Sequence, residues 1–449
     1  MRIAIYSSSG NGTESEHMGI FNYLPTKAEQ WDEISEMFPE HEFSVYFCLH
    51  GGMTVEENGF EVFAKAKNVS YTIIPFDSSA EDVAALIVSG SPDVAVAFAV
   101  PSDPFDWGAV HDSIVADKLR AKGIRTIAHD TLLSMETFEK HIINEKLKKL
   151  GFNVPIGVYV NKRLFDAGYE KFGIVKNAYK DYIRESIIKL SFPVIIKYDI
   201  GLGSFGLSVA YTVDEAMEII SSDNSGMDFL VEERINGINF GVEVFGADGK
   251  YSFHGPIIFS SNEDGVTVPF LSVKYGPVKN KAFNIDALKE EILRMANELN
   301  FCGGVQVDLM FSDGKWYVIE LNPRFSYMSL LTAAIEDKNM LLNYIEPVVY
   351  DEKNTMSEFE QKPALSFKSL VYDEEIIRNL FNDFDSIKSV TRTKYQDAKF
   401  SEMCVGGVDT PYDLVNEMKR IQAKYPDIVS EIVISNISKL IDFCESYSD

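Results

Sequence analysis

The order of strand-like and helix-like segments, and its change near residue 154, constrains the fold of this chain more than any other feature. Apolar strand-like runs alternate with helical stretches up to residue 128, at residues 2–6, 43–49, 69–76, 92–100 and 124–128. Such alternation is typical of an open parallel sheet. A helix is expected to follow over 134–151, with Gly151 as its stop signal.

Paired strands dominate from Val154 onward. The turn sequences at 247–249 (ADG) and 312–314 (SDG) indicate hairpins. Helices are expected near 213–221 and 286–299, a charged linker begins at 351, and a tail of strands and helices runs from 364 to 449. The predicted fold class is therefore α/β in the first part and α+β in the rest.

The bulk properties exclude several classes of protein. The chain has 449 residues, which predicts two to four domains. Its formal net charge of −26 argues against nucleic acid and anionic membranes as partners, and no apolar run approaches the ~20 residues of a membrane span. The four cysteines, Cys48, Cys302, Cys404 and Cys444, form no CxxC pair. With no signal peptide apparent at the N-terminus, we expect reduced thiols and a cytoplasmic protein.

A glycine array, GLGSFG at 201–206, directly follows the strand-like segment VIIKYDI. In a dinucleotide-binding fold these glycines would open a helix, but here the strand-like LSVAY follows them. In protein kinases the lysine lies on a later strand, whereas Lys197 precedes this loop. The loop amides, the Ser204 hydroxyl and Lys197 suit a phosphate group. A flexible hairpin with a solvated lysine is the alternative.

A second motif is the hairpin GGVQVDLMFSDGKWYVIELNPRFS at 303–326. Asp308 and Glu320 lie symmetrically about its turn, so we expect them to be cross-strand neighbours with Cβ atoms about 5 Å apart. Asn322 shares their face, roughly opposite Gln306. Two carboxylates and an amide suit a hard divalent cation, Mg²⁺ or Mn²⁺. The alternative, an exposed polar face, is disfavoured because Arg324 follows at once.

Together these segments resemble the ATP-grasp superfamily, which includes D-alanine–D-alanine ligase, biotin carboxylase and the L-amino acid ligases. The resemblance covers roughly residues 1–350 and rests on five motifs in order: EKHIINEKLKKLGFNVP, FPVIIK with its glycine loop, FLVEERINGINF, the Asp308–Glu320–Asn322 set, and ELNPR. It implies an N-terminal α/β domain (1–133), a lid subdomain with the glycine loop (134–235), a catalytic subdomain with the metal site (236–350) and a C-terminal α+β extension (351–449).

The resemblance also implies roles for individual residues. Lys140 and Lys197 would bind the phosphates of ATP. The lid would be formed by the loop residues Gly201, Gly203, Ser204, Phe205 and Gly206. Asp308, Glu320 and Asn322 would be the metal ligands, and Arg324 of ELNPR would lie near the transferring phosphoryl group.

The segment FLVEERINGINF resembles the hinge that binds adenine. Glu232 would accept a hydrogen bond from the adenine amino group, beside Glu233. The backbones of Arg234 and Ile235 would supply the remaining contacts. Asn239 stands where the family commonly has a ribose-binding acid, which leaves that contact in question.

Two further departures affect the expected substrate. Gln306 occupies the position of an arginine in D-alanine–D-alanine ligases, which places the oxyanion role on Arg324. Ser326, Tyr327 and Met328 replace glycines that many relatives have, so the acceptor pocket is expected to differ. His254 and Lys274 lie in segments that face the second substrate in relatives. His50 and residues 7–13 are weaker candidates, and each of these positions also has a purely structural interpretation.

The expected activity is that of a carboxylate–amine ligase. ATP would phosphorylate a carboxylate, and an amine would attack the acyl phosphate to give an amide, ADP and phosphate. We expect small-molecule carboxylate and amine substrates, and a homodimer is compatible with the sequence. Two alternatives stay open: a carboxylase-like enzyme that activates bicarbonate or formate, and a non-catalytic nucleotide-binding module.

Overall fold

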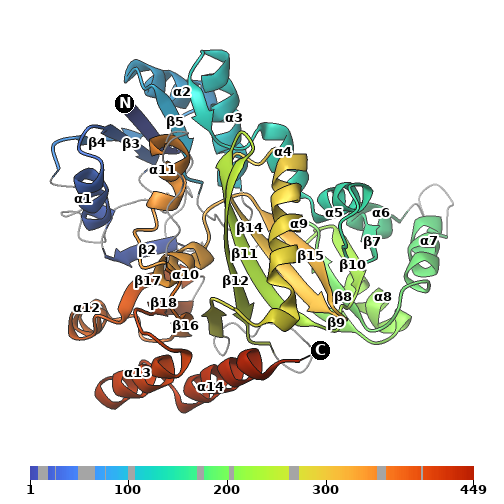
Figure 1. Cartoon of the computed structure of the whole chain (residues 1–449). Coiled ribbons are helices and arrows are strands. Elements are labelled where there is room, and N and C mark those ends of the chain that lie inside the picture. Colours follow the sequence, from blue (N-terminus) through green and yellow to red (C-terminus); the bar gives the residue numbers. More distant parts are fainter. Residues whose placement is uncertain are drawn as a thin grey trace.

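The computed structural model describes residues 1–8, 19–25, 27–48, 66–75, 77–99, 107–168, 176–201, 207–261, 273–350, 360–395 and 398–448. Within these residues the strands form three sheets, of five, four and nine strands, which we call the N-terminal, small and large sheets. Figure 1 shows the large sheet in the centre, with the N-terminal sheet and the small sheet at opposite sides of it.

The N-terminal sheet is parallel, with strand order β4-β3-β1-β5-β6, as the alternating pattern predicts. Its strands are β1 (Arg2–Ser7), β3 (Glu42–Cys48), β4 (Val69–Ile74), β5 (Val94–Ala97) and β6 (Arg125–Ile127). The helices between these strands are α1 (Lys27–Met37), α2 (Ala80–Ser89) and α3 (Trp107–Ala121). The strand order changes direction between β1 and β5, and a crevice at the carboxyl ends of strands is expected at such a point.

The helix predicted over 134–151 is in fact two helices, α4 (Thr131–Phe138) and α5 (Lys140–Lys149). Glu139 between them has an extended backbone (φ −98°, ψ 103°). The break is stabilised from outside, because the amide of Lys140 donates to the carbonyl of Asp199 (3.1 Å) and the amide of His141 donates to the Asp199 carboxylate (2.8 Å). The α5 helix ends before Gly151, whose φ of +82° fits its predicted role as a stop.

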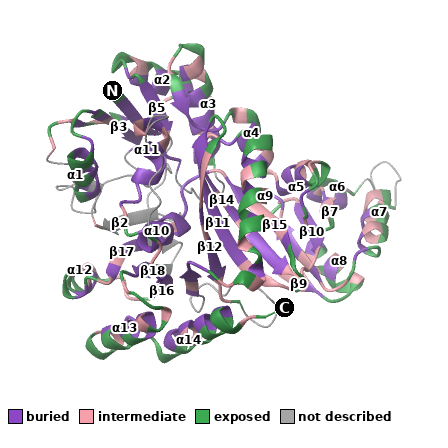
Figure 2. Ribbon diagram, in the orientation of Figure 1, coloured by how far each residue is buried: buried purple, intermediate pink, exposed green. Residues whose placement is uncertain are grey.

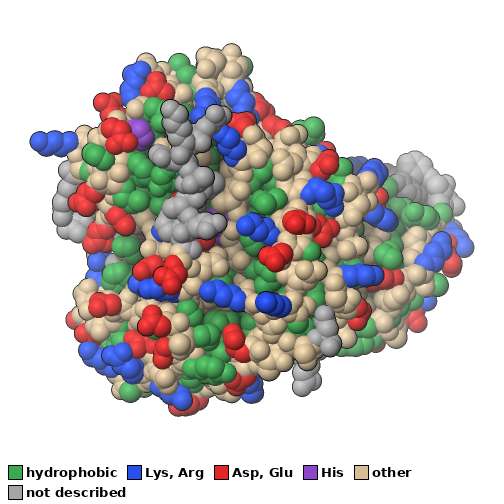
Figure 3. All heavy atoms as spheres, in the orientation of Figure 1, with side chains coloured by type: hydrophobic (Ala, Val, Ile, Leu, Met, Phe, Trp, Pro, Cys, Tyr) green, Lys and Arg blue, Asp and Glu red, His purple; other side chains and the backbone are tan. Residues whose placement is uncertain are grey.

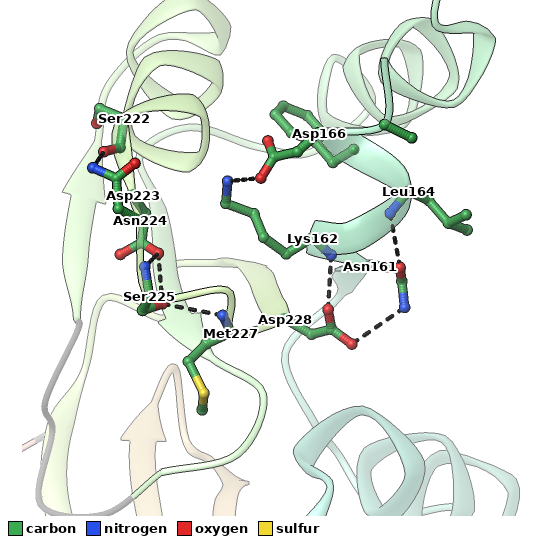
Figure 4. Close-up of polar contacts among 12 residues, drawn as sticks. Asn161, Lys162, Leu164, Asp166, Ser222, Asp223, Asn224, Ser225, Met227 and Asp228 are labelled. Carbon is green, nitrogen blue, oxygen red and sulfur yellow. Dashed lines mark hydrogen bonds and ion pairs between the residues drawn. The ribbon is translucent and has the colours of Figure 1, made fainter. Parts of the chain in front are cut away.

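The small sheet is antiparallel, with order β7-β10-β8-β9. Its elements are β7 (Gly157–Val160), β8 (Val194–Tyr198), β9 (Ser208–Ala210), β10 (Phe229–Glu233), α6 (Lys162–Phe165), α7 (Ala178–Ile187) and α8 (Val213–Ser222). Asp228, just before β10, accepts from the Lys162 amide (2.7 Å) and from the Asn161 side chain (3.3 Å) (Figure 4). This carboxylate therefore joins the start of β10 to the start of α6.

The large sheet has the order β15-β14-β11-β12-β13-β16-β18-β17-β2. Its strands are β2 (Gly19–Leu24), β11 (Ile238–Ala247), β12 (Lys250–Phe259), β13 (Val273–Gly276), β14 (Gly303–Ser312), β15 (Lys315–Asn322), β16 (Ala364–Ser369), β17 (Ile387–Tyr395) and β18 (Ala398–Val405). Strands of the predicted C-terminal extension thus continue the sheet of the predicted catalytic part. The proposed domain boundaries stay predictions. The charged linker beginning at 351 lies largely outside the described residues.

Helices cover both faces of the large sheet. One apolar core joins the sheet to α9 (Ile285–Glu298), α12 (Glu374–Asp383), α13 (Pro411–Lys424) and α14 (Glu431–Ser446). A second core contains α10 (Tyr327–Ile335) and α11 (Leu342–Val349) and extends to the N-terminal sheet. A short 3-10 helix, Lys281–Phe283, precedes α9. Figure 2 shows the strands buried and the outer faces of the helices exposed.

The surface combines both signs of charge. On the face drawn in Figure 3, acidic and basic side chains are interspersed. Among the described helices, none has the length and apolarity required to cross a membrane.

Candidate active site

Two carboxylates and an amide share one face of the β14–β15 hairpin. Asp308 is the register partner of Glu320, and Gln306 is the partner of Asn322, which confirms the predicted pairing. The turn at Asp313 and Gly314 has φ values of +50° and +69° and pairs Ser312 with Lys315. An irregularity between Asp308 and Leu309 then shifts the register by one residue, which places Asp308 opposite Glu320. Period-two alternation then directs Val305, Val307 and Leu309 into the opposite core.

The two carboxyl groups differ in their electrostatic surroundings. Partial burial raises the pKa of Asp308 to about 6, and the neighbouring charge of Glu320 adds to the increase. Burial alone would also raise the pKa of Glu320, but the ammonium groups of Lys140 and Lys197 outweigh it and lower that pKa. Like charges held this close favour either a shared proton or a bound cation.

Lys140 reaches this pair from the first residue of α5. Its Nζ lies 3.2 Å from Glu320 Oε1 and donates to the carbonyl of Gly201 at 3.1 Å. The break at Glu139 starts α5 at Lys140 and so directs this side chain toward the hairpin. Lys140, Glu320, Asn322 and Gly201 line one pocket, together with Ala109 at the start of α3.

Lys197 lies on β8 and faces away from the apolar set of Val194 and Ile196, as the alternation predicts. Its Nζ is 2.6 Å from Glu232 Oε2 on β10, and both residues are buried. Burial alone would lower the pKa of Lys197, but the charges of Glu232 and Glu320 raise it. Lys197 therefore stays protonated within the electrostatic field of the hairpin carboxylates.

The structure gives Glu232 a different environment from the one expected of an adenine contact. Its Oε2 pairs with Lys197, and its Oε1 accepts from Asn144 Nδ2 at 2.7 Å. Each oxygen therefore already has a partner within the protein. The adenine contact of Glu232 stays a prediction. Its contacts in the structure are those of a residue that positions Lys197.

The remaining hinge residues follow β10. The Glu233 carboxylate accepts from the Ser191 amide (2.8 Å), and the Arg234 amide donates to the carbonyl of Pro193 (3.1 Å). Ile235 and Asn239 are partly exposed. Asn239 lies two residues before Gly241, the register partner of Asp308, and so shares the face of the carboxylates.

Arg324 follows β15 and is buried. Its Nη2 donates to Asn322 Oδ1 at 3.0 Å, and Asn322 Nδ2 in turn donates to Asp308 Oδ2 at 3.4 Å. The guanidinium charge acts on both Asp308 and Glu320. The structure thus brings Arg324 to the side of the predicted metal ligands.

Part of the glycine loop is described. Gly201 has a φ of +154°, a conformation that glycine adopts more readily than other residues, and its carbonyl binds Lys140. Gly203, Ser204, Phe205 and Gly206 lie outside the described residues, as do His50 and residues 9–13 of the N-terminal candidate segment.

The weaker substrate candidates have partners of their own. His254 is buried, with Nδ1 at 2.6 Å from Glu336 Oε1 and Nε2 at 2.6 Å from Ser252 Oγ. Ser326 caps α10 by accepting from the Met328 amide, and its hydroxyl donates to Glu243 (3.2 Å). These contacts describe structural roles for both residues.

Three residues near the site were not singled out from the sequence: Asn144, His141 and Asp199. Asn144 lies one helical turn after Lys140, a spacing that places both side chains on one face of α5. His141 Nδ1 lies 2.6 Å from the Asp199 carboxylate, and the imidazole stacks on Tyr159 at 4.0 Å between centroids. The i, i+4 spacing from Lys140 could have identified Asn144 from the sequence. The pairing of His141 with Asp199 could not be identified in this way, because it joins segments that are distant in the sequence.

The donor set on the hairpin fits a hard divalent cation. Asp308 and Glu320 are side by side and repel each other, and Asn322 lies on the same face. Its Nδ2 faces Asp308 while its Oδ1 accepts from Arg324, so the amide would rotate to offer its oxygen to a cation. Burial is the main cause of the raised pKa of Asp308, and repulsion from Glu320 adds to it; a cation between the carboxylates would offset that repulsion.

Comparisons with known proteins find similar sequences and similar folds. A family model described as an ATP-grasp domain matches residues 138–327. A carbamoyl-phosphate synthase of Methanobrevibacter smithii is 26% identical over 182 residues, which are 39% of this chain and 49% of that protein. The chain spans about half, or less, of the length of the curated relatives it matches.

Solved structures share the whole architecture at low sequence identity. The L-amino acid ligase of Bacillus licheniformis superposes with a TM-score of 0.62 at 14% identity, covering 94% of this chain and 97% of that chain. The biotin carboxylase domain dimer of the Hydrogenobacter thermophilus 2-oxoglutarate carboxylase, solved with MgADP, ADP and bicarbonate, gives a TM-score of 0.64 at 13% identity. That match covers 99% of this chain and 95% of the other. At these identities the likeness establishes the fold alone.

Proposed function

Because residues 138–327 belong to the ATP-grasp domain family, we propose that this protein is an ATP-dependent ligase. It activates a small-molecule carboxylate as an acyl phosphate, and an amine then attacks to form an amide or peptide bond. ADP and phosphate are the other products. ATP and Mg²⁺ are the cofactors typical of this family.

The observation that carries the proposal is that charged residues from distant segments lie close together beside the pocket lined by Lys140 and Glu320. Lys140 from α5 and the β14–β15 carboxylates meet at 3.2 Å, and Lys197 from β8 lies within reach of the charge of Glu320. Two cations and two carboxylates in one place suit a nucleoside triphosphate with its divalent metal. An ordinary ion pair would require only one group of each sign.

Each residue has a proposed part in the reaction. Lys140 and Lys197 bind phosphate oxygens and hold the triphosphate in line with the acceptor. Arg324 stabilises the oxyanion that develops at the reacting carboxyl carbon, a kind of contribution often worth about 3–4 kcal/mol. Glu232 and Asn144 hold Lys197 in place.

The metal would be held by Asp308, Glu320 and Asn322. Mg²⁺ or Mn²⁺ bound there supplies charge neutralisation at the β- and γ-phosphates. The fit rests on the two adjacent carboxylates, whose mutual repulsion a divalent cation would offset. Displacement of a proton from Asp308 would accompany metal binding.

A second candidate activity is the activation of bicarbonate. We consider it because a carbamoyl-phosphate synthase matches 182 residues of this chain and a structure of the same fold was solved in complex with bicarbonate. The proposed nucleotide and metal residues would serve either reaction, because both begin with phosphorylation of a carboxylate.

An ADP-release assay tests the proposal. Purified protein with MgATP is supplied with amino acids singly and in pairs, and products are identified by mass spectrometry, with ¹⁴C-bicarbonate in a parallel series. Amine-dependent ADP release with an amide product is the expected result. ADP release that requires bicarbonate alone would support the second candidate. Absence of ADP release in every series would favour the non-catalytic module and contradict both activities.

A further inference from the structure

A group of polar side chains lies across β13, β16 and β18 of the large sheet. Lys274 on β13 is the register partner of Ser366 on β16, and Ser366 is the partner of Cys404 on β18. Directly opposed residues on neighbouring strands share one face. The next pair on that face, two residues further along, is Lys368 with Glu402.

This face is distinct from the apolar face of the same strands. Leu365, Phe367 and Met403 point into the core beneath α12, α13 and α14. Lys368 and Glu402 alternate with them and therefore point toward the side of the sheet that carries α10 and the hairpin carboxylates. Charged residues rarely occupy such buried positions unless they are paired.

Glu402 has one satisfied and one free oxygen. Its exposure is 4%, and Oε1 accepts from Lys274 Nζ at 3.3 Å and from Ser366 Oγ at 3.4 Å. Oε2 has no donor among the described residues. An unsatisfied oxygen on a buried carboxylate is costly, so a further cationic or N–H donor is expected there.

Among the described residues, Lys368 has no anionic partner, just as one oxygen of Glu402 has no donor. Its Nζ lies 5.0 Å from the centroid of the Phe400 ring, and no ion pair joins it to a carboxylate within the described part of the chain. Burial lowers the pKa of Lys368 more than the attraction of Glu402 raises it. Among the residues that the structure describes, the ammonium group therefore has no close anionic partner, although Glu402 is its cross-strand neighbour.

Lys274 connects these two residues to the candidate active site. It forms the ion pair with Glu402, and its charge also acts on Asp308, where it opposes the increase in pKa. A ligand held beside Lys274 would thus lie between the metal ligands and the C-terminal strands. Between Lys274 on β13 and Asp308 on β14 lie β11 and β12, where the ends of Met328 and Phe259 fill the space that a side chain at Gly241, opposite Asp308, would occupy.

We propose that Lys368 and Glu402 form the subsite for a free α-amino acid, with Lys368 binding its carboxylate and the free oxygen of Glu402 binding its ammonium group. One zwitterion bridging the two side chains would satisfy both. Lys274 then holds Glu402 in position and stands between the amino acid and the hairpin carboxylates. This inference rests on the proposed function, because it identifies an amino acid as one of the ligase substrates.

A bicarbonate ion would satisfy only part of this arrangement. It could bind Lys368 and Lys274, but it offers no cation for Glu402 Oε2. A simple amine would have the opposite defect, since it leaves Lys368 without an anion. The requirement for both charges on one small molecule is therefore the property to test.

Binding is measured by calorimetry on the full chain with Mg²⁺ and the non-hydrolysable analogue AMP-PNP. The standard amino acids are titrated one at a time, followed by two analogues of the tightest binder. One analogue is the α-hydroxy acid, which lacks the ammonium group, and the other is the amino acid amide, which lacks the carboxylate. We expect each analogue to bind roughly ten- to hundredfold more weakly, the effect of losing one charge-assisted hydrogen bond.

Two variants assign the charges to residues. Lys368→Met should weaken the amino acid by a similar factor while leaving its amide unaffected. Glu402→Gln should weaken the amino acid while leaving the hydroxy acid unaffected, and it retains an oxygen for Lys274. Lys399→Met is the matched control, because Lys399 lies exposed on the same strand and contacts only the Tyr372 ring, at 5.3 Å, among the contacts described. Thermal melting checks that each variant is folded.

Different experimental outcomes would refute the amino acid subsite and the proposed ligase function. The inference is overturned if no amino acid binds, or if both analogues bind as tightly as the amino acid. The analogue series needs no variant, so it decides the question even if Glu402→Gln does not fold. Amino acid binding without ADP release would refute the ligase and leave the subsite in place. Release of ADP with bicarbonate alone, and no amino acid binding, would refute the subsite and leave an ATP-dependent enzyme.

Discussion

The buried pair of Lys197 and Glu232 gives a prediction that separates a structural role from a functional one. Their charged atoms are 2.6 Å apart, and the two side chains are 10% and 4% exposed. At an effective dielectric constant of 20, the attraction between unit charges at that distance is about 6 kcal/mol. Desolvation offsets much of this, so the net value of the intact pair is far smaller.

Removing one partner leaves the other as a buried charge whose desolvation is no longer offset by an ion pair. In Lys197→Met, Glu232 keeps only Asn144 as a donor and becomes a buried, unpaired carboxylate. We expect this variant to lose about 3–5 kcal/mol of stability. In Glu232→Gln the loss should be smaller, because Glu320 still attracts Lys197. The double variant should recover most of the stability lost by Lys197→Met, because neither charge is then buried alone.

Nucleotide binding should follow a different pattern in the same variants. Lys197 is proposed to bind a phosphate, so both variants that lack it should bind MgATP roughly ten- to hundredfold more weakly. Urea unfolding followed by circular dichroism measures stability, and calorimetry measures MgATP affinity. If the double variant regains nucleotide affinity along with stability, Lys197 acts only through the fold. If Lys197→Met unfolds at the wild-type urea concentration, the buried pair carries no such energy.

Three other perturbations test separate parts of the structure. Glu320→Gln should abolish Mg²⁺-dependent ADP formation while circular dichroism stays unchanged, and undiminished turnover would refute the metal assignment. Gly157→Ala should raise the KM for ATP, because its Cβ would lie 2.9 Å from Glu232 Cγ and 3.2 Å from the Val231 carbonyl oxygen and would displace the Lys197–Glu232 pair. An unchanged KM would mean that the Lys197–Glu232 pair tolerates this displacement. Burial lowers the pKa of His129 from 6.5 to about 4, so between these values the unfolded chain binds the extra proton and stability falls as pH decreases. The wild-type chain should lose up to roughly 3 kcal/mol of unfolding free energy between pH 7 and 4 because of His129, and His129→Gln should not show this loss in urea unfolding. If the unfolding free energies of both proteins change in parallel with pH, this prediction is wrong.

The sequence was sufficient where local geometry decides the outcome. The pairing of Asp308 with Glu320 was predicted from their symmetry about Gly314, and the structure confirms it. The pairing is reached through a two-residue turn and a one-residue irregularity beside Asp308, and the sequence pattern did not predict that irregularity. The direction of Lys197 follows from period-two alternation within one strand. The parallel N-terminal sheet follows from repeated strand–helix units, whose order local patterning determines.

Contacts between distant segments were the part that local patterns could not supply. The break at Glu139 depends on Asp199, which caps α5 from 60 residues further along the chain. The contacts of Glu232 with Lys197 and Asn144 join three separate segments and form only in the folded chain, so the sequence did not show them. The pairing of β16 with β13 likewise joins segments that the sequence analysis had placed in separate domains.

Binding of Mn²⁺ followed by electron paramagnetic resonance is the most direct test of whether the lysines and the hairpin carboxylates serve a single metal–triphosphate complex. Titration of the wild-type chain with Mn²⁺ in the presence of ATP should reveal a nucleotide-dependent site that Glu320→Gln removes and Lys197→Met weakens. Equal Mn²⁺ binding by the three proteins, or binding indifferent to ATP, would contradict the account.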